Sequence, residues 1–246
     1  MRKKALILIV EGETDEAVFE PMLKKFLSPD LVRVQVTYGD VFTKKENYKK
    51  SPKTIVGEIV STFKKRYGYK PTDIIGIIQI TDIDGSYLSE NNFKIDADSP
   101  EFVKNKSIHF YDMESKNIIC QSEVKRSDLL KTWSLKHKRM EQLKSITKIA
   151  EFPYRLYYMH FDLDCVIGGK PCYTSAEKRI CTNNFCQMIN GDLTKFIKFF
   201  NDPNLISGKN YDETWSNIAS DSDQFRIQSN INLLFEFLEE KGYKNI

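Results

Sequence analysis

The sequence predicts an α/β protein built on a parallel, Rossmann-like sheet, with a helical elaboration toward its carboxyl-terminal end. Two strand candidates, ALILIV at 5–10 and IIGIIQIT at 74–81, are almost wholly apolar. Strand and helix patterns alternate from the first to the second, in the order β-α-β-α-β. Strands joined by helical crossovers are nearly always parallel, and apolar strands of this kind are covered on both faces.

The elements between these two strands are predicted from spacing and from capping residues. A helix is expected over 14–27, because its apolar residues recur at intervals of three and four. We expect Thr14 to cap this helix and Pro21 to kink or shorten it. Residues 32–38 alternate between apolar and polar side chains, which predicts a strand.

A second helix is predicted after the polar loop that follows this strand. Ser51 is a suitable N-cap, Pro52 suits the first helical position, and Gly68 lies where the helix should end. The remaining chain predicts one more strand and four helices. The strand spans 153–163, and the helices span 122–148, 175–190, 192–201 and 222–241, the last capped by Ser222 and stopped by Gly242.

These elements predict two regions that form one compact unit. Residues 1–90 should make the β-α-β-α-β core, and residues 91–246 should continue the sheet and add a basic helix and the carboxyl-terminal helices. A chain of 246 residues is long enough to bury a substantial core.

Composition limits the function classes. The net charge is +3 at pH 7, so any nucleic-acid surface must come from local clustering of Lys and Arg. No apolar run approaches the roughly 18–20 residues that span a bilayer, which favours a cytoplasmic protein without a membrane partner. Four of the five cysteines, between Cys165 and Cys186, are separated by six, eight and four residues, which favours buried thiols over a zinc site.

Acidic side chains follow both apolar strands at the point where each strand ends. Glu11 comes directly after the first strand, and Asp82 and Asp84 come after the third. The carboxyl ends of parallel strands meet at one edge of a sheet, so these side chains should face one crevice. Oxygen ligands of this kind suit Mg²⁺, with Mn²⁺ as a substitute, and such an ion orients phosphates and activates water. Glu11 is then placed to move a proton.

These residues resemble a known family. LIVEGETDE followed by TDIDG is similar to the two signature motifs of the TOPRIM domain, which topoisomerases, primases and the nucleases of the overcoming-lysogenization-defect class share. The resemblance covers about residues 5–90. It implies that Glu11 serves acid/base or metal chemistry and that Asp82 and Asp84 bind Mg²⁺. It also implies a further acidic metal ligand four positions after the glutamate, where Asp15 stands.

The resemblance also implies a function and a partner. A small stand-alone TOPRIM protein is most similar to the nuclease effectors of bacterial anti-phage systems, which are toxic and often work with an ABC-type ATPase. This chain has no GxxxxGK[ST] loop, so such an ATPase would be a separate chain. We therefore expect an Mg²⁺-dependent endonuclease, and the sequence leaves DNA and RNA, including tRNA, open as substrates.

The predicted helix at 122–148 is basic and carries candidate nucleic-acid contacts. Lys136, Lys138 and Arg139 lie near the aromatic Trp133, and a nuclease needs cations beside its acidic site to hold the phosphate backbone. The alternative interpretation is a solvated helix face, which charge runs usually are.

Other interpretations stay open at this stage. The TDIDG motif also resembles the first motif of haloacid-dehalogenase phosphatases, in which Asp82 would be the nucleophile. The chain could instead be a catalytically silent TOPRIM subunit that binds an ATPase. FDLD at 161–164 ends another strand candidate, so Asp162 and Asp164 are either further metal ligands or part of a strand-end turn.

Overall fold

A central sheet organises the protein. The computed structural model describes residues 4–27, 30–105, 107–171, 174–220 and 224–243. The strands run in the order β2-β1-β3-β8-β7, and β9 pairs with β8. Neighbours among the first four are parallel, whereas β7 and β9 are antiparallel to β8. The strands are β1 (Ala5–Val10), β2 (Val32–Val36), β3 (Ile74–Asp82), β7 (Lys148–Ile149), β8 (Phe152–His160) and β9 (Gln228–Ser229).

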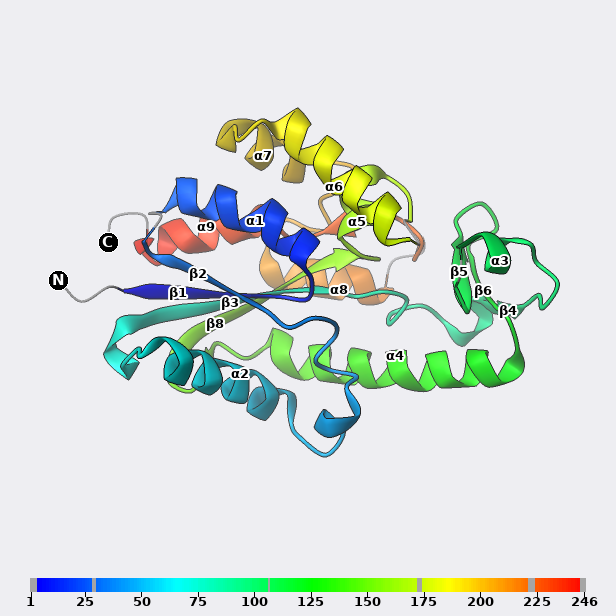
Figure 1. The fold of residues 1–246 in the computed structure, drawn as a ribbon, viewed down its shortest axis with the longest axis horizontal. Coiled ribbons are helices and arrows are strands. Elements are labelled where there is room, and N and C mark those ends of the chain that lie inside the picture. Colours follow the sequence, from blue (N-terminus) through cyan, green and yellow to red (C-terminus); the bar gives the residue numbers. More distant parts are fainter. Residues whose placement is uncertain (1–3, 28–29, 106, 172–173, 221–223, 244–246) are drawn as a thin grey trace.

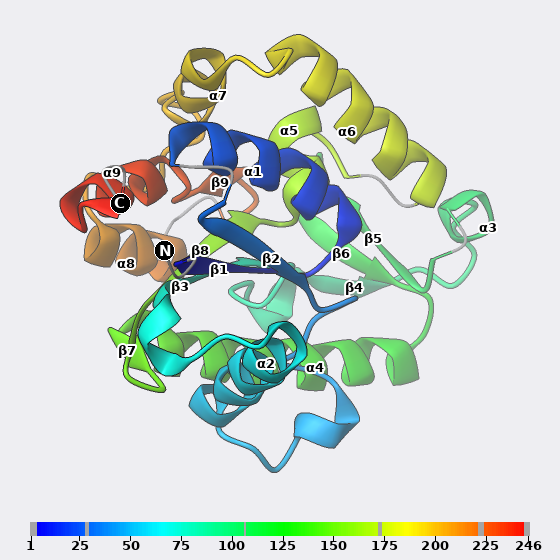
Figure 2. The ribbon, with the colours of Figure 1, turned by 60° about the vertical axis from the view of Figure 1, so that its left-hand side comes forward.

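Helices cover both faces of this sheet, as Figures 1 and 2 show. Successive residues of β1 alternate between two core clusters: Leu6 and Leu8 pack into one and Ile7 and Ile9 into the other. The first cluster includes side chains of α1 (Glu13–Phe26), α5 (Leu163–Gly168), α6 (Ser175–Ile189), α7 (Leu193–Phe200) and α9 (Asn232–Glu240). The second includes side chains of α2 (Pro52–Tyr67), α4 (Glu123–Lys144) and α8 (Tyr211–Ser220).

A second, smaller sheet stands beyond the carboxyl ends of the central strands, at the far end of α4 (Figure 1). Its strands run in the order β4-β6-β5, and it was not predicted. It joins the rest of the molecule through aromatic contacts: the ring centroids of Phe93 and Trp133 are 5.6 Å apart, and those of Tyr111 and Phe161 are 4.5 Å apart. The elements are β4 (Phe93–Ile95), α3 (Glu101–Asn105), β5 (His109–Asp112) and β6 (Asn117–Cys120).

Short 3₁₀ turns lie in three of the connections, at η1 (Lys45–Asn47), η2 (Pro71–Asp73) and η3 (Glu90–Asn92). No helix in the described residues is long and apolar enough to cross a membrane. Of the five cysteines, Cys172 lies outside the described residues, and the other four are free thiols.

The predicted class is confirmed, because the fold is α/β with a mostly parallel sheet. The strand expected at 153–163 is β8, so the second half of the chain does continue the sheet. The capping of α2 is also as predicted. Ser51 Oγ accepts a hydrogen bond from the Thr54 amide at 3.1 Å, and Gly68 ends the helix with a left-handed backbone, φ 69°.

Two local predictions about α1 need correction, namely its N-cap and the expected shortening at Pro21. The N-cap is Gly12 rather than Thr14, because the carboxylate of Asp15 turns back and accepts a hydrogen bond from the Gly12 amide at 2.7 Å. Pro21 lies inside a helix that continues to Phe26. Pro21 is the ninth residue of α1, so the helix loses the one hydrogen bond that an amide at this position would donate to the carbonyl of Ala17.

The helix predicted at 222–241 is shorter than expected. It begins at Asn232, and Gln228 and Ser229 form β9 against β8 instead. The spacing of apolar residues alone does not distinguish the short strand β9 from an additional turn of helix. The strand forms because it pairs with β8, which is distant in the sequence. The proposed cap, Ser222, lies outside the described residues. Helix α8 was not predicted.

Candidate active site

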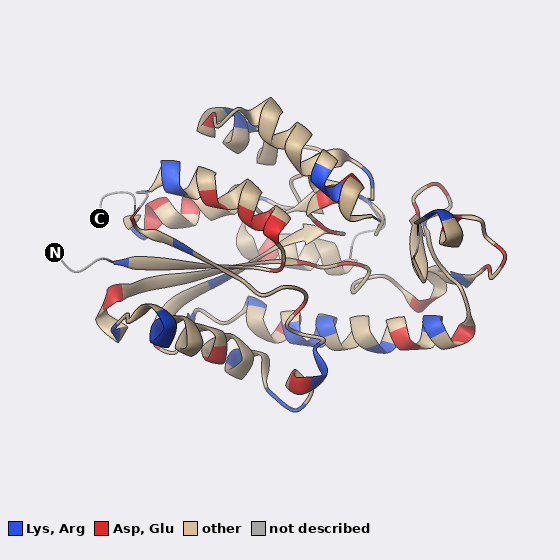
Figure 3. Cartoon of the chain, viewed as in Figure 1, with Lys and Arg blue, Asp and Glu red and all other residues tan. Residues whose placement is uncertain are grey.

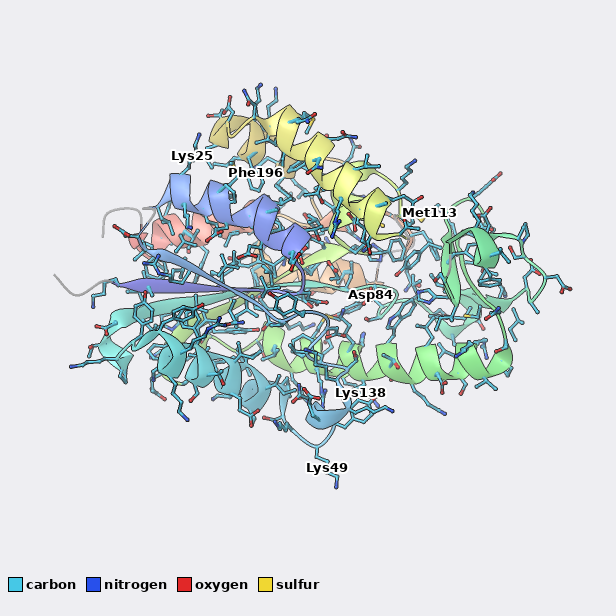
Figure 4. All side chains as sticks on the ribbon, in the orientation of Figure 1. Lys25, Lys49, Asp84, Met113, Lys138 and Phe196 are labelled. Carbon is cyan, nitrogen blue, oxygen red and sulfur yellow. The ribbon has the colours of Figure 1, made fainter. Side chains whose placement is uncertain are left out.

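Acidic side chains gather where the parallel strands end. β3 pairs with β1 on one side and with β8 on the other, so the residues that follow all three strands leave the sheet at one edge. Figure 3 shows acidic residues along this edge, and Figure 4 shows Asp84 between the sheet and the small β4-β6-β5 sheet. The acidic residues of this edge are Glu11, Asp15, Asp40, Asp82, Asp84, Asp162 and Asp164.

The side chain of Glu11 joins the ends of β1 and β3. Its Oε1 accepts hydrogen bonds from the backbone amide of Asp82, at 3.2 Å, and from the hydroxyl of Thr81. The side chain is 15% exposed. Two motifs that lie 71 residues apart in the sequence are therefore hydrogen-bonded to each other.

The environment of Glu11 favours its protonated form. Burial raises the pKa of this carboxyl from 4.5 to about 8; the charge of Lys136 opposes the rise, and Asp40 and Asp84 add to it. Without a further cation, Glu11 therefore holds a proton at neutral pH. A bound cation would reverse this preference, because it favours the ionised carboxylate.

Lys136 of α4 is wholly buried among three acidic side chains. Its Nζ lies 2.7 Å from Asp84 Oδ2, 3.5 Å from Asp40 Oδ2 and 3.6 Å from Glu11 Oε1. Burial by itself would lower the pKa of this ammonium group. The surrounding carboxylates outweigh burial and hold the pKa well above its usual range. Lys136 is thus a permanent positive charge inside the acidic edge.

Asp40 is a member of the site that the sequence analysis missed. It lies in the loop after β2, the edge strand next to β1, and its carboxylate accepts hydrogen bonds from the Phe42 amide at 2.7 Å and from Thr43 Oγ1 at 3.0 Å. A signal was available, because the dipeptide at 39–40 follows a parallel strand at the same sheet edge as Glu11.

Asp82 lies between the two halves of the acidic edge. Its Oδ1 accepts a hydrogen bond from the Leu163 amide at 3.2 Å. Burial raises the pKa of this carboxyl well above its usual range, and Asp15 and Glu11 raise it further. No lysine among the described residues pairs with Asp82 within 4.0 Å, so a proton or an added cation would neutralise it.

The second half of the edge surrounds Lys178 of α6. Its Nζ lies 2.9 Å from Asp164 Oδ2 and 3.3 Å from Asp162 Oδ2. Asp162 also caps α5, because its Oδ1 accepts a hydrogen bond from the Cys165 amide at 2.8 Å. Asp162 and Asp164 thus form a strand-end turn that also faces the acidic edge. Lys178 was not singled out from the sequence, since no motif marks it.

Asp15 belongs to this second half. It is 5% exposed. Burial raises the pKa of its carboxyl from 3.8 to about 7; the hydrogen bond from the Gly12 amide opposes the rise, and Asp164 adds to it. The structure therefore brings together all four acidic residues that the sequence predicted, although Asp15 lies on the Lys178 side and Glu11 and Asp84 on the Lys136 side.

The predicted nucleic-acid contacts differ from the expectation. Lys136 and Arg139 are buried, at 0% and 4% exposure, so they do not form the exposed basic surface that the predicted contact with nucleic acid needs, nor the solvated face of the alternative interpretation. The physical reason is the helix face: both side chains point from α4 toward groups that need a cation, which are carboxylates for Lys136 and backbone carbonyls for Arg139. Lys138 is exposed, and its contact with nucleic acid stays a prediction.

Comparison of the chain with family models, with curated proteins and with solved structures returned no match. Within the described residues, no three His, Cys, Asp or Glu side chains are already close enough together to hold a metal ion. The site as it stands is held together by Lys136 and Lys178, which lie among the carboxylates.

Proposed function

We propose that this chain is an Mg²⁺-dependent nuclease of TOPRIM type that cleaves phosphodiester bonds. The observation that carries the proposal is the hydrogen bond from the Asp82 amide to Glu11 Oε1. It places the glutamate of the first motif beside the aspartate pair of the second, at the carboxyl edge of a mostly parallel sheet. This is the arrangement that the resemblance of the two motifs implies.

The chemistry of the donor set fits a hard divalent cation. Seven carboxyl groups share two lysines, and the pKa values of Glu11, Asp15 and Asp82 are all raised, which indicates that these groups lack positive charge. Carboxylate oxygens are the ligands that Mg²⁺ and Mn²⁺ prefer. Asp82 and Asp84, with Asp15 in support, would hold the ion. When bound, the ion supplies a Lewis acid that neutralises charge on a phosphate and lowers the pKa of water.

The protein's own groups have distinct roles in this proposal. Glu11 is held by two hydrogen bonds and lies beside the aspartate pair, so it is placed to accept or return a proton at the reacting oxygen. Lys136 fixes the orientation of Asp84 and keeps Asp40 and Glu11 from repelling each other. Lys178 does the same for Asp162 and Asp164.

The biological role that the resemblance favours is a toxic effector of anti-phage defence. In this role the chain would act with a separate ABC-type ATPase. Expression of the wild-type chain, alone and with such an ATPase, tests the role: growth arrest that the Glu11→Gln change abolishes supports it, and growth that is equal for both chains contradicts it.

A three-substrate assay tests the reaction class. The purified protein is incubated with plasmid DNA, tRNA and p-nitrophenyl phosphate, with Mg²⁺, with Mn²⁺ or with EDTA. Metal-dependent cleavage of either nucleic acid supports a nuclease and identifies its substrate. Release of p-nitrophenol with no nucleic-acid cleavage supports a phosphatase. No turnover of any of the three supports a silent binding subunit.

A further inference from the structure

Arg139 anchors a surface loop to the acidic edge. We call residues 37–51, between β2 and α2, the basic loop. The buried guanidinium of Arg139 donates hydrogen bonds to four carbonyl oxygens of this loop, with distances of 2.6 Å to that of Asn47 and 3.2 Å to those of Tyr48 and Lys50. The fourth acceptor is the carbonyl of Phe42. A planar guanidinium presents several donors in fixed directions, so these contacts fix the shape of the loop.

Further hydrogen bonds inside the basic loop support the same shape. The buried side chain of Asn47 donates to the Val41 carbonyl at 2.9 Å. The ammonium group of Lys44 donates to the Thr37 carbonyl at 2.8 Å, and Lys50 pairs with Glu58 at 2.6 Å. The loop therefore has a defined conformation, and two of its four lysines have partners.

The other two lysines and two tyrosines face outward. Lys45 and Lys49 are exposed, and no carboxylate of the described residues lies within 4.0 Å of either ammonium group. Tyr38 is 74% exposed and Tyr48 is 51% exposed. Figure 4 shows Lys138 of α4 on the same side of the molecule as Lys49. The loop thus presents two lysines without an ion pair beside exposed aromatic rings, and Glu46 is its one exposed acidic residue.

The basic loop begins at the acidic edge itself. The amide of Gly39 donates to the Glu11 carbonyl at 2.8 Å, and Asp40 contacts both Lys136 and the amide of Phe42. A chain that bound along the loop would therefore pass next to Glu11 and Asp84. The exposed cations near the site are therefore those of this loop together with Lys138 of α4, and not the buried Lys136 and Arg139.

We propose that the basic loop, together with Lys138, is the surface that binds the substrate, and that the substrate is a single-stranded segment of nucleic acid. The inference rests on the proposed nuclease function. Lys45, Lys49 and Lys138 contact the phosphate backbone, and Tyr38 and Tyr48 stack on unpaired bases. Stacking platforms beside a positive groove are the means by which proteins bind single strands, whereas paired bases inside a duplex do not present their faces.

Binding without cleavage tests this proposal. A fluorescent single-stranded oligonucleotide of about 20 residues, long enough to cover several stacking positions, and the matching duplex are titrated with the protein in EDTA by fluorescence anisotropy. The double variant Lys45→Glu/Lys49→Glu is compared with Lys195→Glu/Lys198→Glu, which makes the same charge change on exposed positions of α7, on the opposite side of the molecule (Figure 1).

We expect the loop double variant to bind more weakly and to lose about 1.4 from the slope of log affinity against log salt, since each single-strand phosphate contact contributes about 0.7. The α7 variant should keep the wild-type slope. A loop variant that keeps the wild-type slope would overturn the loop as the binding surface. Equal loss for both would show that only net charge matters, which also overturns it.

The tyrosines test the single-strand part. Tyr48→Ala and Tyr38→Asn should each weaken single-strand binding about five- to 150-fold and leave duplex binding unchanged. Asn tolerates the left-handed backbone of Tyr38, φ 52°. Tyr67→Ala, at the other end of α2 and equally exposed at 51%, is the matched control. Tyrosine variants that bind like wild type, or a duplex that binds more tightly than the single strand, would overturn stacking.

The binding assay separates this inference from the proposed function. Loss of binding in the loop variants with no cleavage by the wild type under any metal would leave the surface correct and the nuclease wrong. Metal-dependent cleavage that the loop variants retain at the wild-type KM would leave the nuclease correct and the surface wrong.

Discussion

The ammonium group of Lys136 lies 2.7 Å from the carboxylate of Asp84, and the lysine side chain is completely buried. This pair couples helix α4 to the end of β3, because Lys136 also lies within 4.0 Å of Asp40 and Glu11. A buried cation among three acidic side chains makes the acidic edge part of the fold as well as a site for chemistry. Replacing Lys136 should therefore lower the stability of the folded protein.

Lys136→Met should destabilise the protein by about 2 kcal/mol at pH 8 in EDTA, because it leaves the partly buried carboxylates of Asp40 and Asp84 without their counter-charge. The control is Lys138→Met, two positions along the same helix and exposed, which should change stability by no more than about 0.5 kcal/mol. Urea denaturation measures both. Equal stabilities for the two variants would contradict the role given to Lys136.

Glu11→Gln should lower the rate of metal-dependent cleavage about 10²- to 10⁴-fold, the range for a positioned acid or base, while the protein stays folded. The amide oxygen of glutamine preserves the acceptor for Thr81 and for the Asp82 amide. Single-turnover kinetics measure the rate, and circular dichroism checks the fold. Full activity of Glu11→Gln, together with inhibition of the wild type by beryllofluoride, would favour an aspartyl-phosphate mechanism at Asp82 instead.

The pH dependence of stability follows from the raised pKa values. The pKa of Glu11 is about 8 in the folded protein against 4.5 ordinarily, and that of Asp15 is about 7 against 3.8. Between these limits the folded state holds protons that the unfolded state has released. The free energy of unfolding should therefore fall as pH rises from about 5 to about 8 in EDTA.

Thermal unfolding across this pH range measures the effect, and Glu11→Gln should flatten the curve and unfold at a higher temperature than wild type at pH 8. Added Mg²⁺ should raise the unfolding temperature most at pH 8, where the carboxyl groups ionise more readily and bind the ion. An unfolding temperature that rises steadily with pH in EDTA would contradict the buried, proton-holding state of these carboxyls.

Arg139→Lys should loosen the basic loop, because an ammonium group cannot replace a guanidinium that reaches four carbonyl oxygens. Hydrogen exchange should become faster in residues 42–50, while exchange in β1 and β3 stays slow. The exposed Arg179 of α6, changed to Lys, is the control. Unchanged exchange in the loop would show that Arg139 does not anchor it.

The sequence predicted most of the central sheet because its signals are local. The strands β1 and β3 are apolar on both faces, and the caps of α2 are coded by adjacent residues. The small sheet was missed because its strands have three or four residues and half-buried side chains, too short for a period to emerge. The sequence predicts helix where β9 forms, because the pairing of β9 with β8 involves residues about 70 positions away, which no local pattern indicates.

The site was predictable to the extent that topology determines it. Parallel strands imply that Glu11 and the Asp82–Asp84 pair share an edge, and the structure brings them together. The positions of Lys136 and Lys178 depend on how α4 and α6 pack, which no local pattern encodes. The packing of α4 also explains why its basic residues were expected to be exposed, although Lys136 and Arg139 are buried.

Cleavage by aspartate variants tests the central claim most directly. Asp82→Asn and Asp84→Asn keep the side-chain size and remove the charge that would bind the metal ion, and Asp128→Asn makes the same change at an exposed position of α4. With the nucleic acid that the wild type cleaves and saturating Mg²⁺, we expect no measurable cleavage by the first two variants and wild-type cleavage by the third. Wild-type rates for Asp82→Asn and Asp84→Asn would contradict a metal-dependent nuclease site at this edge of the sheet.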